Sequence, residues 1–258
     1  MLGALAGDII GSRFEGGPAP VRGFDLFHAD CRFTDDSVCS LAVADAMLGD
    51  RDFAASLRRF ARRYPDAGYG PMFREWALAD DLPGCGSWGN GAPMRTAAIG
   101  WLVDGERQAL SLAAAQAEVS HNHPDAVAAA QAVTLAILLA RCGKSADKIR
   151  ARLTRSFGYE LTANQAFAAG GFDVSARGTV QAALTAALDA PDWTSAVRKA
   201  VDLGGDTDTV ACITGAVAEA LHGVPDAVAA QTRTYLTPDL CDVLDRFETT
   251  RAKGRAAP

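Results

Sequence analysis

Apolar residues recur with the spacing of an α-helix along almost the whole chain, and this pattern constrains the fold more than any other feature. No segment alternates apolar and polar residues regularly enough to predict a β-strand. Alanine, the best helix former, supplies 52 of the 258 residues, and its small side chain lets helices pack closely. The sequence therefore predicts an all-α fold. No linker, low-complexity tract or repeat divides the chain into separate domains.

Capping residues, prolines and glycines indicate where the predicted helices begin and end. Asp52 suits an N-cap, Pro124 a first helical residue, and Gly143 and Gly223 helix ends. The predicted helices cover residues 35–48, 53–63, 71–79, 92–103, 107–119, 124–142, 145–157, 178–188, 194–203, 207–222 and the chain from 237 or 238 onward. We expect one compact domain over residues 1–252 and a frayed tail at 253–258. The irregular stretches 13–34, 80–91, 158–177 and 203–206 are the candidates for functional loops.

The net charge of −6 disfavours several kinds of partner. Such a surface repels nucleic acid and anionic lipid, so an anionic ligand would need local donors or metal ions. The six cysteines form no CxxC pair, which argues against a zinc site and favours reduced thiols in a cytoplasmic protein. The N-terminus lacks the basic start of a signal peptide, and the most apolar stretch, 127–140, is too short to span a bilayer.

Two short acidic segments, each at the start of a predicted helix, are the strongest candidates for a functional site. The first contains Thr34, Asp35 and Asp36, and the second contains Asp206, Asp208 and Thr209. Carboxylate and hydroxyl oxygens are the ligands that Mg²⁺ and Mn²⁺ prefer. Either segment alone is better explained by helix capping, whereas both together favour a shared binuclear site. An EF-hand over 206–217 is excluded, because Ala211 and Val217 occupy the positions that need Gly and Glu.

A glycine-rich loop covers residues 84–91 and leads into the predicted helix at Ala92. Its letters match GxGxxG, but no strand precedes it, so a dinucleotide-binding βαβ unit is excluded. The loop has two remaining interpretations. It presents bare backbone N–H groups to phosphate oxygens, or it is a flexible turn.

Three other polar positions are candidates with a structural alternative. Glu15 follows the end of the first helix and suits a general acid or base on a loop, or a solvated surface residue. Asp8 is expected to be structural, bonded to a nearby loop. His121 and His123 offer metal ligands two residues apart, but such residues more often cap the helix that begins at Pro124.

Five segments, taken in order, resemble the ADP-ribosylglycohydrolase family of the dinitrogenase-reductase-activating type. They are residues 7–15, 34–36, 89–95, 121–124 and 204–209, and the resemblance extends from residue 3 to about residue 222. It implies the orthogonal all-α fold of that family, with two Mg²⁺ or Mn²⁺ ions in a central cleft.

The resemblance also implies roles for individual residues. The implied metal ligands are Thr34, Asp35, Asp36, Asp206, Asp208 and Thr209. The implied contacts to the pyrophosphate and its ribose are Ser87, Gly89, Asn90 and Gly91. His121 would lie near the bound nucleotide, and Glu15 on a loop that closes over the substrate.

The implied reaction is hydrolysis of the C1″ glycosidic bond of ADP-ribose on a modified macromolecule. The metal ions would hold the ribose 2″- and 3″-hydroxyls, a water would attack C1″, and Asp36 or Glu15 would transfer protons. Two alternatives stay open. One is a hydrolase of another ADP-ribose derivative or nucleotide-like substrate on the same binuclear site, and the other is a non-catalytic ADP-ribose-binding protein. Ser87 and Trp88 stand where arginine-specific relatives often carry an acidic residue, so the acceptor is open between arginine, serine, asparagine and a nucleic-acid base. A monomer is expected by default.

Overall fold

The computed structural model describes residues 1–18, 20–21, 23–162 and 172–256, and these form thirteen α-helices and two 3-10 helices. The α-helices are α1 (Leu2–Gly11), α2 (Asp35–Leu48), α3 (Phe53–Arg63), α4 (Pro71–Leu78), α5 (Ala97–Leu102), α6 (Glu106–Glu118), α7 (Pro124–Arg141), α8 (Ala146–Phe157), α10 (Ala176–Leu188), α11 (Trp193–Asp202), α12 (Thr207–His222), α13 (Asp226–Tyr235) and α14 (Pro238–Ala256). The 3-10 helices are η1 (Ser12–Phe14) and η2 (Pro93–Arg95). The predicted all-α fold is confirmed, since the only β-type pairing in the described ranges is an isolated bridge between Gly89 and Ser175.

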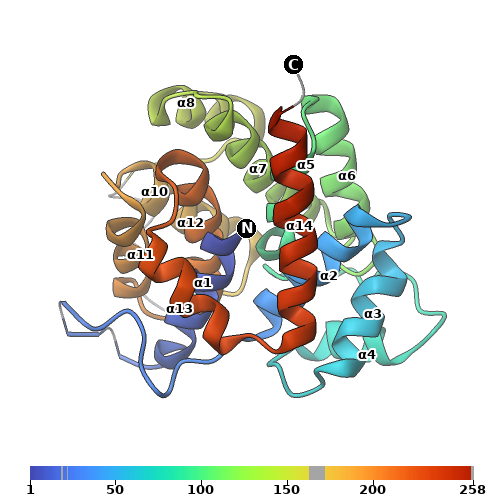
Figure 1. The fold of residues 1–258 in the computed structure, drawn as a ribbon. Coiled ribbons are helices and arrows are strands. Elements are labelled where there is room, and N and C mark those ends of the chain that lie inside the picture. The colour runs from blue at the N-terminus through green and yellow to red at the C-terminus, as the bar shows by residue number, and fades with distance from the viewer. Residues whose placement is uncertain (19, 22, 163–171, 257–258) are drawn as a thin grey trace.

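Helix α12 lies in the middle of the molecule, with α1, α7, α10 and α11 packed around it (Figure 1). Every residue from Thr207 to Glu219 is buried, so other parts of the protein pack against all faces of this helix. Its composition explains this position, because alanine, glycine, valine and threonine leave room for other helices to approach from every side. Helix α14 packs against α2 and α5 (Figure 1).

Helices α1 and α12 approach so closely that their backbones touch. A Cβ atom on Gly7 would lie 2.0 Å from the carbonyl oxygen of Ala211, and one on Gly11 would lie 2.4 Å from that of Thr207. Only glycine fits at these positions of α1. The two helices run antiparallel, so the contact places the end of α1 beside the beginning of α12.

Most predicted helix boundaries agree with the structure. Those of α2, α3 and α12 agree to the residue, and those of α4, α6, α7, α8, α10 and α11 agree within two residues. The predicted helix over 92–103 is wrong, because it is divided into η2 and α5; the Thr96 hydroxyl donates to the Pro93 carbonyl at the division. Helix α13 was not predicted, because Val228 and Thr232 are its only buried residues and its apolar spacing is weak.

Two further predictions, the frayed C-terminal tail and the short apolar stretch, also differ from the structure. Helix α14 continues through Ala256, so residues 253–256 are helical rather than frayed, and residues 257–258 lie outside the described residues. The apolar stretch at 127–140 belongs to α7, which at 18 residues is long and apolar enough to cross a membrane by length and composition alone. However, 61% of that helix is buried within the fold, as expected of a core helix. All six cysteines are unpaired.

Candidate active site

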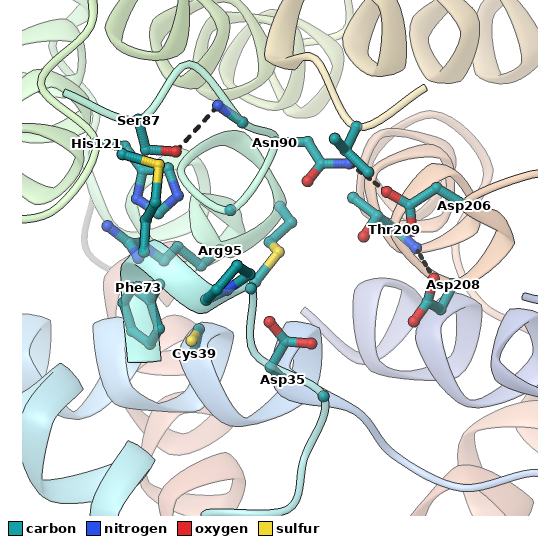
Figure 2. A pocket seen from close by; sticks show the side chains of 18 of the residues that line it. Asp35, Cys39, Phe73, Ser87, Asn90, Arg95, His121, Asp206, Asp208 and Thr209 are labelled. Atoms are coloured by element: carbon teal, nitrogen blue, oxygen red, sulfur yellow. Dashed lines mark hydrogen bonds between the residues drawn. The ribbon is translucent and has the colours of Figure 1, made fainter. Parts of the chain in front are cut away.

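A cavity of about 360 Å³ opens between the beginnings of α2 and α12 on one side and the glycine-rich loop on the other (Figure 2). Its polar lining includes Glu15, Asp35, Ser87, Asn90, Asp206 and Asp208. Predicted loops supply several of these residues, because 13–34, 80–91 and 203–206 all reach the cavity. The loop 158–177 reaches it through Phe172 and Val174, and residues 163–171 of that loop lie outside the described residues.

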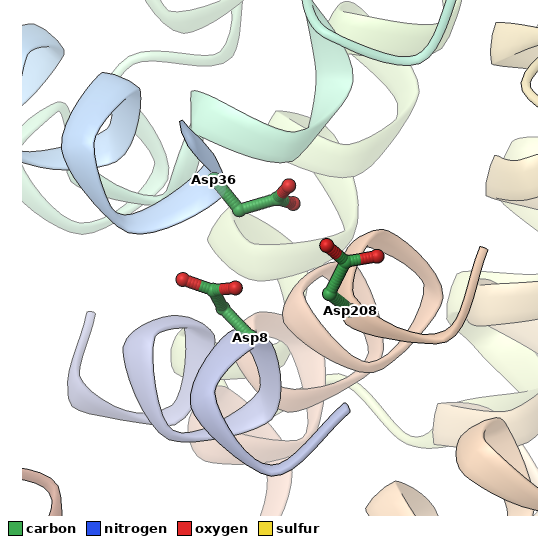
Figure 3. Close-up of side chains that lie close together, drawn as sticks. All are labelled: Asp8, Asp36 and Asp208. Carbon is green, nitrogen blue, oxygen red and sulfur yellow. The ribbon is translucent and has the colours of Figure 1, made fainter. Parts of the chain in front are cut away.

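The two acidic segments meet beside this cavity. Carboxylate oxygens of Asp8, Asp36 and Asp208 lie within 4.8 Å of one another, projecting from α1, α2 and α12 (Figure 3). The Thr209 hydroxyl donates to Asp36 Oδ2 at 3.1 Å, which joins α12 directly to α2. A second group shares Asp208, since oxygens of Glu15, Asp206 and Asp208 also lie within 4.8 Å of one another.

Asp8 holds the beginning of α2 in place, as the sequence predicted for a structural residue. Its carboxylate accepts from the backbone N–H of Thr34 at 3.0 Å, from the Thr34 hydroxyl at 2.6 Å, and from the backbone N–H and hydroxyl of Ser37. The Thr34 oxygen in turn accepts from the Asp36 N–H at 3.3 Å. Thr34, implied as a metal ligand, is thus the N-cap of α2 in this structure, and its hydroxyl proton is directed to Asp8.

Burial and mutual repulsion raise the pKa values of these carboxyl groups. Burial is the largest cause for Asp36 and Asp208, whose pKa values lie well above the usual range, and the neighbouring aspartates raise them further. Burial, then Asp8 and Asp206, raise the pKa of Asp35 to about 8. No ion pair between described residues joins any of these groups to a lysine or arginine. Buried carboxylates without a cation are costly, and the described residues supply none to this cluster.

The residues present fit a divalent metal ion. Asp36 Oδ1 is buried, and no described residue donates a hydrogen bond to it. A buried carboxylate oxygen without a hydrogen-bond donor is available to coordinate a metal ion. The donor set consists of carboxylate and hydroxyl oxygens, which hard cations such as Mg²⁺ and Mn²⁺ prefer. The clustered aspartates could therefore bind metal.

The glycine-rich loop is fastened to the beginning of α10 rather than left open. The Asn90 N–H donates to the Val174 carbonyl at 3.0 Å, and the Ala176 N–H donates to the Trp88 carbonyl at 2.9 Å. The Gly89 N–H donates to the Ser87 hydroxyl at 3.2 Å. The expectation that this loop presents bare N–H groups to phosphate is therefore wrong at positions 89 and 90.

Asn90 connects the loop to the acidic side of the cavity. Its Nδ2 donates to Asp206 Oδ2 at 2.5 Å (Figure 2). The same nitrogen donates to the Thr179 hydroxyl at 3.1 Å. Both amide protons are therefore engaged within the protein, and the side-chain carbonyl is the polar atom that Asn90 keeps for a ligand. This bond also fixes the direction of the Asp206 carboxylate.

Comparison with protein-family models identifies the chain. The model described as ADP-ribosylglycohydrolase matches residues 1–255. The chain belongs to the ADP-ribosylglycohydrolase family. A solved structure, named as an ADP-ribosylglycohydrolase-related protein complex, is similar to it with a TM-score of 0.67 and 24% sequence identity. The match covers 97% of this chain and 94% of that one, and it confirms the fold. Membership of a family of glycohydrolases supports a hydrolase.

The wall of the cavity opposite the aspartates contains residues to which the sequence analysis gave no role in the site. Arg95 and Phe73 line it together with His121, which the resemblance did imply (Figure 2). The available signal for Arg95 was a single charged residue within the otherwise small and apolar stretch 92–103. The second histidine, His123, accepts from the Asp125 N–H at 3.2 Å and caps α7, so the two histidines do not share a site.

Proposed function

We propose that this protein is a metal-dependent ADP-ribosylhydrolase that cleaves the C1″ glycosidic bond between ADP-ribose and a modified macromolecule. One observation carries the proposal. The acidic beginnings of α2 and α12 meet at a cavity, and no described residue provides a cation for the buried carboxylates of Asp36 and Asp208. Family membership supplies the reaction class.

The proposed ligands of the metal ions are the six residues of the two acidic segments. They are Thr34, Asp35, Asp36, Asp206, Asp208 and Thr209. When bound, two Mg²⁺ or Mn²⁺ ions would balance four aspartate charges and hold the ribose hydroxyls. The two carboxylate groups found in the structure share Asp208, which supports two ions with a common ligand. Neutralisation of this centre also allows an acidic protein to bind the anionic pyrophosphate.

Glu15 is the residue best placed to transfer protons in the reaction. It lines the cavity, and burial and then Asp206 raise its pKa, which suits a general base. Asp36, the other residue implied for this role, is buried among Asp8 and Asp208 and does not line the cavity. We therefore assign Asp36 to metal binding. In the proposed reaction the oxygen of a water bonds to C1″ and the bond from C1″ to the acceptor breaks. Glu15 takes a proton of the water and returns it to the leaving atom, which gives ADP-ribose and the unmodified acceptor.

The loop that carries Glu15 is anchored beside the reacting centre. The Gly16 N–H donates to the carbonyl of Gly205 at 2.9 Å, so the loop after η1 is joined to the loop before α12. This bond keeps the Glu15 carboxylate near Asp206 and Asp208. The Glu15 side chain is exposed, as the alternative of a surface residue predicted, but its position beside Asp206 and Asp208 supports a role in chemistry.

The glycine-rich loop would contact the pyrophosphate and its ribose through Ser87, Gly89, Asn90 and Gly91. Because the N–H groups of positions 89 and 90 are engaged, the contacts would use the Ser87 hydroxyl, the Asn90 carbonyl and the open backbone surface of the glycines. Trp88 and Phe172 also line the cavity, with 51% and 55% of their surfaces exposed, and they offer aromatic faces for a planar base.

A panel of substrates tests this function. Peptides carrying ADP-ribose on arginine, serine or asparagine, and ADP-ribosylated nucleic acid, would each be incubated with Mg²⁺, Mn²⁺ or a chelator. We expect ADP-ribose to be released from at least one acceptor with metal, and no release with chelator. Binding of ADP-ribose without release from any acceptor would favour a non-catalytic protein, and turnover only of free ADP-ribose derivatives would favour the other alternative. The monomeric state and the cytoplasmic location stay predictions.

A further inference from the structure

Arg95 lies entirely inside the protein beneath the wall of the cavity, where it forms directed hydrogen bonds. Its exposed surface is 0%. Nε donates to Gln116 Oε1 at 2.7 Å, and Nη2 donates to the Gln116 carbonyl and to the Ser120 hydroxyl oxygen, each at 2.8 Å. Gln116 is itself held by bonds from its Nε2 to the carbonyls of Ala92 and Ala113. The guanidinium is therefore fixed in orientation.

The Ser120 hydroxyl connects the fixed guanidinium of Arg95 to the His121 ring. Its Oγ lies 2.9 Å from His121 Nδ1. Arginine only donates, so the Ser120 oxygen accepts from Arg95 and its own proton is free for Nδ1. If Nδ1 carried the ring proton instead, the Ser120 proton would have no acceptor among the described residues, and a buried hydrogen bond would be lost. The arrangement therefore favours an unprotonated Nδ1 and a proton on Nε2.

The Nε2 edge of the His121 ring lies beside the glycine-rich loop that borders the cavity. A Cβ atom on Gly91 would lie 2.7 Å from Nε2, so this edge lies directly against the glycine-rich loop. No described residue hydrogen-bonds to Nε2, and the ring is part of the cavity lining (Figure 2). Burial, and then the charge of Arg95, lower the pKa of His121 to about 3, which agrees with a neutral ring.

We propose that Arg95 is a positioning residue that, through Ser120, holds His121 as the neutral Nε2–H tautomer. The ring then donates a constant hydrogen bond to an oxygen of the ligand in the cavity. The identity of that oxygen, on a phosphate or a ribose, rests on the proposed function. The tautomer itself does not, because it follows from contacts within the protein.

Nitrogen-15 NMR of the histidine rings in the ligand-free protein measures the tautomer directly. The chain has four histidines, so His121→Gln identifies the signals of His121. We expect Nδ1 to resonate as an unprotonated nitrogen and Nε2 as a protonated one, without change between pH 5 and pH 8. A proton on Nδ1, an equal mixture of tautomers, or titration of the ring in this interval would overturn the proposal.

Ser120→Ala removes the hydroxyl that connects the two residues. We expect the His121 signals to move toward a mixture of tautomers and the Kd for ADP-ribose with Mg²⁺ to rise about five-fold, the equivalent of one hydrogen bond. Ser56→Ala is the matched control, because Ser56 is buried and donates to the Ala42 carbonyl far from the cavity. Unchanged His121 signals in a folded Ser120→Ala protein would contradict the proposal.

The two measurements separate this inference from the proposed function. A wild-type protein that shows the Nε2–H tautomer but does not bind ADP-ribose would contradict the proposed function. It would leave the positioning of His121 by Arg95 and Ser120 intact. A protein that binds and hydrolyses the substrate with a proton on Nδ1 of His121 would support the proposed function and contradict the inferred tautomer. If Ser120→Ala does not fold, the wild-type spectrum alone decides the tautomer.

Discussion

The pair of helices α1 and α12 carries a buried acidic site at each end, and the two sites are built differently. At one end, Glu219 accepts from the Met1 ammonium at 3.0 Å, from the Gly3 N–H at 2.8 Å and from Arg251 at 2.8 Å. Burial alone would raise the pKa of Glu219, but the two cations outweigh it and the pKa lies below its usual value. This buried charge is neutralised within the chain.

At the other end of the same helices, the carboxylates of Asp8, Asp36 and Asp208 lie together without a cation among the described residues. Burial and mutual repulsion raise the pKa values of Asp36 and Asp208 instead of lowering them. The contrast shows that the chain neutralises the buried Glu219 carboxylate with its own cations, whereas the described residues do not do so for the aspartates. We therefore infer that the uncompensated end is kept for a cation from outside the chain.

The largest effect is expected where the chain supplies its own cations. In Glu219→Gln, the buried Met1 ammonium loses its carboxylate partner and Arg251 keeps only the more exposed Glu248, so the free energy of unfolding should fall by about 3 kcal/mol. Urea denaturation measures the change. Activity per folded molecule should be unchanged, because Glu219 lies at the end of α12 away from the cavity.

Glu248→Gln is the matched control for that substitution. Glu248 also contacts Arg251, at 3.4 Å, but its side chain is 30% exposed, and such a pair contributes less than about 1 kcal/mol. If the two variants were destabilised equally, Glu219 would not be the group that neutralises the cations, and the comparison between the two ends would fail.

The opposite result is expected at the uncompensated end. Asp208→Asn should lower metal-dependent release of ADP-ribose about 10²-fold, or about 2.7 kcal/mol of transition-state stabilisation. In chelator its free energy of unfolding should be unchanged or higher, because one repelling charge is removed. Asp104→Asn, at a side chain 91% exposed, serves as the control. Full activity of Asp208→Asn, or a destabilised metal-free protein, would count against a metal site here.

A substitution between the two ends should affect both. In Gly7→Ala the new Cβ would lie 2.0 Å from the Ala211 carbonyl oxygen, so the backbones of α1 and α12 must separate. We expect a loss of about 2 kcal/mol in unfolding free energy and weaker metal binding, measured by urea denaturation and calorimetry. Gly105→Ala is the control, because its Cβ would meet no atom closer than 4.0 Å. Equal stability of the two variants would show that the helices can separate freely.

Local sequence signals predicted the helices but not how they meet. The beginning of α2 follows from Thr34 and the end of α12 from Gly223, which act on adjacent residues. The two acidic segments together favoured a shared site, and the family resemblance implied the meeting of the two helix beginnings. Glycine at positions 3, 7 and 11 was a local sign of a close helix contact, but it does not name the partner helix.

Two features of the site could not be predicted, because their partners are remote in sequence. The N–H groups of the glycine-rich loop are taken by residues such as Val174, which lies 84 positions from Asn90. The fixed guanidinium of Arg95 depends on Gln116 and Ser120 at the end of α6 and just beyond it. A pattern of residue types shows which groups a loop contains, whereas tertiary contacts decide which of them stay available.

The last prediction concerns how the two ends respond to pH. Burial raises the pKa of Asp35 from its usual 3.8 to about 8, so its contribution to stability is complete below about pH 4 and is lost as the pH rises toward 8. Glu219 has a lowered pKa, so its contribution is present above its usual value of 4.5 and is lost as the pH falls. In chelator, the unfolding free energy should therefore decline from pH 5 to pH 8, by at most about 1.4 kcal/mol per pH unit for one group. Saturating Mg²⁺ favours the ionised carboxylates and should flatten this decline, and urea denaturation with and without Mg²⁺ measures the difference. A decline that Mg²⁺ does not change would mean that no cation binds among these aspartates, and the two ends would then differ in stability alone.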